Sequence, residues 1–120
     1  VLIALPGTQG IYGLVTFILM MFQIGLFGGA VNVSHLSGLG LLAIGFGAGL
    51  VYWKSAVYQG ETSAACINLV SKKPEEMGRA IILPVLVETY AVFALLAAVL
   101  GIVFVGAQPT LELVTRAVGP

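Results

Sequence analysis

One acidic residue stands inside a long apolar segment of this sequence. Glu88, in VETYAVFALL, is the single charged residue between positions 80 and 107. A carboxylate at membrane depth is costly, and such residues are usually functional. Because we expect no lysine or arginine at comparable depth, the partner of Glu88 must be a polar group, a proton or a metal cation. The alternative is a protonated, hydrogen-bonded structural acid.

Uncharged polar residues can reach the level of Glu88 from other segments. Glu88 lies 14 residues after Pro74, and Gln59 lies 15 residues before Pro74. Two helices leaving Pro74 at about 1.5 Å per residue would place both side chains about 21–23 Å from it. Gln9 and Thr8 reach a similar depth if a few residues precede the first segment. We therefore expect these four side chains to converge.

The oxygen atoms of this set favour a small hard cation. One carboxylate, two amide oxygens and a hydroxyl are hard ligands, unsuited to a soft transition metal. One negative charge balances one monovalent cation, so Na⁺ fits best and a proton on Glu88 is the competitor.

The stretch ALPGTQGIYG opens the first apolar segment with helix-breaking residues. Pro6 cannot donate a backbone hydrogen bond and Gly7 bends easily, so a loosened turn can aim the Leu5 carbonyl at a ligand. The alternative is a simple helix start with proline in its first turn. Tyr12 shares a helix face with Thr8 and can hydrogen-bond Glu88, or it can be a packing tyrosine.

Composition places the chain in a membrane. It has 120 residues, of which 59% are hydrophobic and 8% charged, and its mean hydropathy is +1.09. The formal net charge of zero gives no electrostatic footprint for nucleic acid. A single cysteine, Cys66, excludes an intrachain disulfide. We expect an integral membrane protein.

The elements that would position these residues are three transmembrane helices, at about 1–27, 36–71 and 75–105, in a membrane domain of residues 1–107. Each apolar segment reaches the roughly 20 residues that a span needs, and strands without a closed barrel are excluded in lipid. Lysine and arginine residues at 72–79 predict a cytoplasmic loop, and Tyr52 and Trp53 beside Lys54 indicate interfacial anchors. A C-terminal tail is expected at 108–120.

The motifs LPGTQGIYG and VETYAVFALL, with YQG and SKKPEE between them, resemble the rotor-ring proteolipids of V-type and A-type ATPases, and within them the sodium-type ring subunit K. The resemblance covers residues 1 to about 105. It implies an all-α membrane protein whose Na⁺ ligands fall on the Leu5 carbonyl, Thr8, Gln9, Gln59 and Glu88, with Tyr12 holding the glutamate.

The resemblance also implies partners and a location. We expect a homo-oligomeric ring in the cell membrane that turns against a stator subunit, and central-stalk subunits that contact the 72–79 loop. The protein would translocate ions and would not be an enzyme by itself. Family members of this type have four helices, whereas three are expected here. With the initial valine, this indicates a truncated sequence.

Three alternative interpretations stay open. The first is the same ring carrying protons, which apolar residues in place of Thr8 and the two glutamines would favour. The second is a membrane structural or assembly protein whose glutamate only hydrogen-bonds. The third is a fragment of a secondary transporter. The chain has no G-x-x-x-x-G-K-[ST] loop, so it does not bind ATP in that way.

Overall fold

The computed structural model describes residues 1–29, 31 and 33–107, and every regular element within them is helical. The expected tail at 108–120 lies outside the described residues. In chain order the elements are η1 (Leu5–Gly7), α1 (Thr8–Gln23), η2 (Leu26–Gly28), α2 (His35–Lys72), η3 (Pro74–Glu76), α3 (Met77–Ala80) and α4 (Ile82–Ala107).

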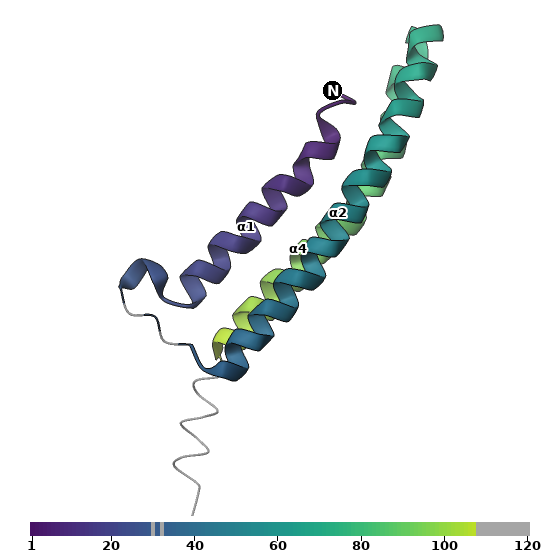
Figure 1. The fold of residues 1–120 in the computed structure, drawn as a ribbon. Coiled ribbons are helices and arrows are strands. Elements are labelled where there is room, and N and C mark those ends of the chain that lie inside the picture. Colours follow the sequence, from purple (N-terminus) through teal and green to yellow (C-terminus); the bar gives the residue numbers. More distant parts are fainter. Residues whose placement is uncertain (30, 32, 108–120) are drawn as a thin grey trace, which may run out of the picture.

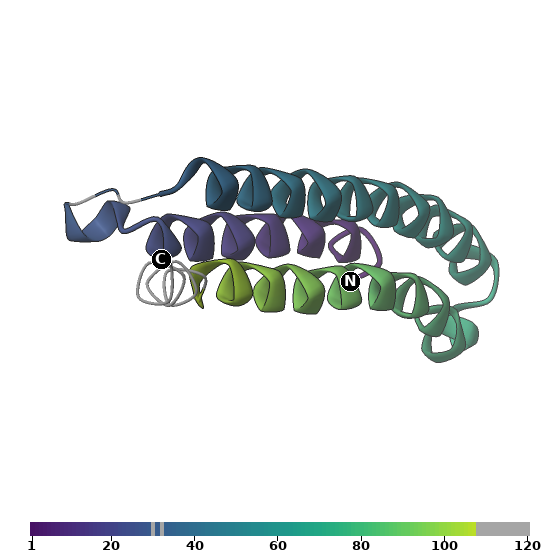
Figure 2. The ribbon, with the colours of Figure 1, turned by 90° about the horizontal axis from the view of Figure 1, so that it is seen from below.

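Three long helices lie side by side in an elongated bundle of 74 × 27 × 18 Å. α1 runs away from the N-terminus, α2 returns, and α4 runs back beside α2 along most of its length (Figure 1). The view from below places all three helices side by side (Figure 2). Within the described residues, three helical stretches are long and apolar enough to cross a membrane: 5–23, 35–72 and 74–106. The chain is therefore a multi-pass membrane protein, with the all-α fold and the three spans expected.

The first helix is shorter than the expected range of 1–27. The Leu5–Gly7 turn before it is a 3₁₀ helix with Pro6 in its first turn. After α1, Gly25 and Gly29 both have φ of 76°, a left-handed conformation that glycine adopts without steric cost. Gly25 follows the end of α1 and Gly29 follows η2, so the two glycines redirect the chain into the connection to α2.

Sequence also explains the ends of α2. The Ser34 side chain accepts a hydrogen bond from the Ser37 backbone N–H at 3.1 Å, which satisfies one open donor at the helix start. The helix continues without interruption past Lys54 to Lys72. Its 38 residues correspond to about 57 Å, well beyond a hydrocarbon core of about 30 Å. Pro74 then opens the short turn that leads into α3 and α4.

A proline explains the break between α3 and α4. Pro84 has no N–H, so the carbonyl of Ala80 lacks its usual helical donor. The Cys66 thiol of α2 donates to this carbonyl instead, at 3.1 Å. The single cysteine therefore satisfies a buried backbone group.

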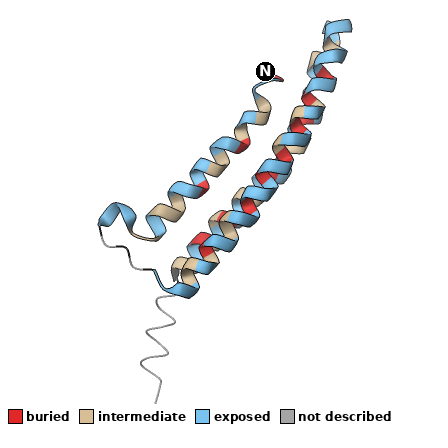
Figure 3. Ribbon diagram, viewed as in Figure 1, coloured by how far each residue is buried: buried red, intermediate tan, exposed pale blue. Residues whose placement is uncertain are grey.

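Many of the buried residues are small or polar, while many large apolar side chains are exposed. Figure 3 shows buried residues alternating with exposed ones along the helices. Ala91 and Ala98 of α4 pack with Ala48 of α2, and a Cβ at Gly101 would lie 2.9 Å from Ile44 Cδ1. Close approach through small residues is typical of helix packing in membranes, where burial of apolar surface gives no driving force.

Tyr52 is not the interfacial anchor that its neighbours suggested. Its side chain is 6% exposed, and its hydroxyl lies 2.9 Å from the Thr16 hydroxyl of α1. Trp53 is 62% exposed, and its ring lies 5.6 Å from the Lys54 ammonium. The interpretation of Tyr52 was wrong because α1 covers this face of α2, which spacing along α2 alone does not reveal.

Candidate functional site

The carboxylate of Glu88 lies where the three long helices meet. Tyr12 of α1 donates its hydroxyl to Glu88 Oε1 at 2.6 Å. Gln59 of α2 donates its amide Nε2 to Glu88 Oε2 at 3.4 Å. Both carboxylate oxygens therefore have a partner on another helix, and Pro84, one turn before Glu88, is fully buried beside them.

Gln59 links this carboxylate to α1. Its side chain is 0% exposed, and its Nε2 also donates to the Pro84 carbonyl at 2.9 Å. Its Oε1 accepts from Nε2 of Gln9 at 2.6 Å. A buried amide is stable only when its donors and acceptor are satisfied, and here three hydrogen bonds fulfil that condition.

Thr8 and the Leu5 carbonyl complete the polar cluster at the start of α1. The Thr8 hydroxyl donates to the Leu5 carbonyl oxygen at 2.9 Å and lies 3.4 Å from Gln9 Oε1. The 3₁₀ turn over Leu5–Gly7 makes this arrangement, because it brings the backbone carbonyl within reach of the hydroxyl three residues later. The cluster thus presents oxygens of one carboxylate, two amides, one hydroxyl and one backbone carbonyl.

The donor set matches a hard monovalent cation better than a divalent transition metal. The described residues contain no cluster of three or more histidine, cysteine, aspartate or glutamate side chains. Neutral amide, hydroxyl and carbonyl oxygens around a single carboxylate supply one negative charge, and they are ligands for hard cations. The arrangement can exchange a proton on Glu88 for a small cation without leaving a net buried charge.

Sequence reasoning missed two polar contacts that support the cluster. The hydroxyl of Ser55 accepts from Gln9 Nε2 at 3.3 Å and donates to the Val87 carbonyl at 3.2 Å. Thr16 and Tyr52 form a second hydrogen-bonded pair further along α1. A signal for Ser55 was present: Ser55, Gln59 and Ser63 recur at four-residue intervals, which places them on one face of α2.

Lys54 lies closer to the level of Glu88 than the sequence suggested. Its neighbour Ser55 bonds to the carbonyl of Val87, the residue before Glu88. The expectation that no lysine or arginine reaches this depth is therefore wrong. The Lys54 ammonium does not face the carboxylate but lies 5.6 and 5.9 Å from the ring centroids of Trp53 and Tyr58.

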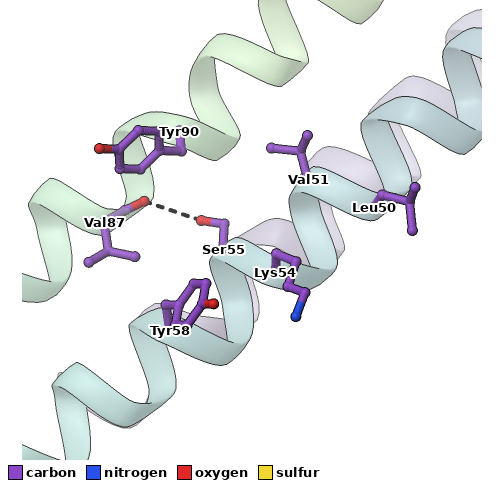
Figure 4. A pocket seen from close by; sticks show the side chains of 7 residues that line it. All are labelled: Leu50, Val51, Lys54, Ser55, Tyr58, Val87 and Tyr90. Carbon is purple, nitrogen blue, oxygen red and sulfur yellow. Dashed lines mark hydrogen bonds between the residues drawn. The ribbon is translucent and has the colours of Figure 1, made fainter.

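A largely apolar pocket of about 570 Å³ lies beside Lys54 and Ser55. Figure 4 shows the Ser55 hydroxyl directed at the Val87 carbonyl beside this pocket. Its lining comes from α2 and α4 and comprises Leu50, Val51, Lys54, Ser55, Tyr58, Val87 and Tyr90.

Comparison with known proteins agrees with a membrane bundle. The sequence model of the ATP synthase C-subunit family matches residues 42–101, half of the chain. The chain is 41% identical over 97 residues to A-type ATP synthase subunit K of Methanocaldococcus jannaschii, a match covering 80% of this chain and 41% of that protein. It is 36% identical over 88 residues to V-type sodium ATPase subunit K of Enterococcus hirae, covering 73% of this chain and 53% of that protein.

These matches define the family. The chain is a membrane proteolipid, and it belongs to the ATP synthase C-subunit family. It spans about half the length, or less, of the two curated relatives. No solved structure matches it significantly.

Proposed function

We propose that this chain is a rotor-ring component of a V/A-type ATPase that carries Na⁺ on Glu88. The observation that carries the proposal is the convergence of three helices on one carboxylate, with Tyr12 and Gln59 bonded to its two oxygens. The proposed ligands are the Leu5 carbonyl, Thr8, Gln9, Gln59 and Glu88. Tyr12 supports the site by orienting the carboxylate.

The chemistry of transport follows from the single carboxylate. Ionised Glu88 holds one monovalent cation, and neutral oxygens replace the water that the cation leaves behind. Release requires a positive group on another protein of the complex to compete for the carboxylate. One elementary charge crossing the membrane is worth about 2.3 kcal/mol per 100 mV. Several ions must therefore pass for each ATP, which a ring of identical protomers provides, and the ATP is bound on other proteins of the complex.

The positive residues at 72–79 indicate which side of the membrane this turn faces. Lys72, Lys73 and Arg79 cluster at the turn between α2 and α4, and positive residues concentrate on the cytoplasmic side. We therefore place residues 72–79 in the cytoplasm, where they would contact central-stalk subunits. The apolar outer faces of the helices would contact lipid, the stator subunit and neighbouring copies in the ring.

Two observations favour sodium over protons. The cluster keeps a hydroxyl and two amides around the carboxylate, which a proton-binding acid does not require. One of the two relatives is named as a sodium ATPase subunit. The proton-carrying ring is the second candidate, because the Tyr12 and Gln59 contacts can serve a protonated acid as well.

Carbodiimide labelling of Glu88 in native membranes tests the proposal, because only the protonated acid reacts. We expect about millimolar Na⁺ to slow labelling at constant pH and K⁺ at the same concentration to leave it unchanged. A Glu88→Gln variant should abolish labelling and so identifies the reacting residue. Labelling that depends on pH alone would assign proton transport, and an unreactive Glu88 would exclude the rotor function.

A further inference from the structure

Ser55 occupies a position behind the proposed ion ligands that nothing in the sequence motifs singled out. It is 5% exposed on α2, one helical turn before Gln59. Its hydroxyl touches both other long helices: Gln9 Nε2 of α1 at 3.3 Å and the Val87 carbonyl of α4 at 3.2 Å. A hydroxyl at a three-helix junction can fix the orientation of the groups around it.

The direction of these hydrogen bonds determines which end of the Gln9 amide faces Ser55. The Val87 carbonyl can only accept, so the single hydroxyl hydrogen of Ser55 points to it. Only lone pairs of Ser55 then remain for Gln9, and they require an N–H donor. The second N–H of the same amide donates to Gln59 Oε1 at 2.6 Å. The Gln9 oxygen is left on the side of Thr8, at 3.4 Å from its hydroxyl.

We propose that Ser55 is a positioning residue that holds the Gln9 amide with its oxygen toward the cation and thereby sets the preference for Na⁺ over protons. This inference rests on the function proposed above. With Ser55 absent, only the Gln59 acceptor holds the amide in this orientation, and an amide turned by 180° could donate its NH₂ to Thr8. That orientation places a donor group where the cation needs an oxygen. Proton binding depends less on it, because the side-chain hydrogen bonds to Glu88 come from Tyr12 and Gln59, and the Gln9 amide reaches the carboxylate only through Gln59.

The pocket beside Ser55 makes a conservative variant possible. Ser55 lines an apolar pocket of about 570 Å³ together with Val51, Tyr58 and Val87 (Figure 4). The additional methyl group of Ser55→Thr has space there, while the threonine hydroxyl keeps the two hydrogen bonds. Ser63 supplies a matched control. It lies two turns further along the same face, is 3% exposed, and has a buried hydroxyl without a hydrogen-bond partner among the described residues.

The experiment measures carbodiimide labelling of Glu88 in native membranes that contain the protein in its assembled complex. Two profiles are recorded for the wild type and for Ser55→Ala, Ser55→Thr and Ser63→Ala: labelling against pH without Na⁺, and protection by Na⁺ at one pH. Loss of one net hydrogen bond corresponds to about fivefold in a binding constant. We expect Ser55→Ala to need about fivefold more Na⁺ for half-protection, with a pH profile close to that of the wild type.

The controls separate a positioning role from a structural one. For Ser55→Thr and Ser63→Ala, the Na⁺ concentration that gives half-protection should stay within about twofold of the wild-type value. A sodium requirement of Ser55→Ala equal to that of the wild type, or an equal shift in the Ser63→Ala variant, would overturn the role of Ser55 while leaving the sodium site intact. A wild type that Na⁺ does not protect would overturn both proposals. If Ser55→Ala does not accumulate, a Ser55→Thr variant that lost protection while keeping its pH profile would equally refute the inference.

Discussion

Replacing Gln59 by leucine removes the side chain that joins all three long helices. Leucine has a similar volume and no polar atom, so the contact between α2 and α4 is largely kept. The change eliminates the hydrogen bonds of Gln59 to Gln9, Glu88 and the Pro84 carbonyl. It also removes one proposed oxygen ligand. Sodium binding should weaken more than in any variant that leaves the carboxylate and its tyrosine in place.

The size of the effect follows from the two bonds that hold site residues. A neutral hydrogen bond contributes about 1 kcal/mol net, and one to a charged group about 1.5–3 kcal/mol. The bond to Gln9 is of the first kind and the bond to Glu88 of the second. Together they amount to about 2.5–4 kcal/mol, which corresponds to roughly 10²- to 10³-fold weaker sodium binding.

The assay is the concentration of Na⁺ that halves carbodiimide labelling of Glu88 in native membranes. Gln23→Leu is the matched control, because it makes the same chemical change at the exposed far end of α1. It should leave the half-protecting concentration unchanged. A Gln59→Leu ring that is protected at the wild-type sodium concentration would show that Gln59 is neither a ligand nor an organiser of the site, and the reasoning would fail.

Two further predictions concern the bundle itself. Cys66→Ala should lower the temperature at which the detergent-solubilised complex dissociates, because the Ala80 carbonyl loses its thiol donor. Cys66→Ser keeps a donor and should retain most of the stability. Equal dissociation temperatures of the two variants would contradict this role of Cys66. Gly101→Val should reduce accumulation of the protein in membranes, because even a Cβ at this position would lie 2.9 Å from Ile44 Cδ1. Quantitative immunoblotting of the membranes measures this accumulation, and a Gly101→Val variant that accumulates to the wild-type level would refute the close packing at Gly101.

Much of the fold was predictable because lipid permits few alternatives. Backbone groups must be satisfied within each span, so three apolar segments predict three helices. The convergence of Gln59 and Glu88 was also accessible, since both lie nearly equal distances from the turn at Pro74. Equal helical rise from a common turn brings side chains to one level without further information.

The contacts that depend on helix rotation were not predictable from spacing. Tyr52 was expected at the membrane interface, yet it faces Thr16 because α1 packs on that side of α2. Lys54 was placed outside the level of Glu88, although the adjacent Ser55 reaches Val87. Covered and exposed residues of α2 lie on the same turn, and only the position of the neighbouring helices decides which are covered.

The burial pattern of α1 has a consequence for how this helix stays attached. The buried residues of α1 are Gln9 and Thr16, both polar, while apolar residues such as Ile11 and Leu14 face outward. In lipid, apolar surface contributes little to helix association, so hydrogen bonds and packing hold α1 to its neighbours.

Under the proposed function, ion occupancy and tertiary structure are thermodynamically linked. A cation that binds only the docked arrangement would stabilise it by about 2.7 kcal/mol at a concentration of 100 times its Kd. The transported ion would then also stabilise the packing of α1 against α2 and α4 for as long as it is bound. A protomer that has just released its ion would be the least tightly held member of the ring.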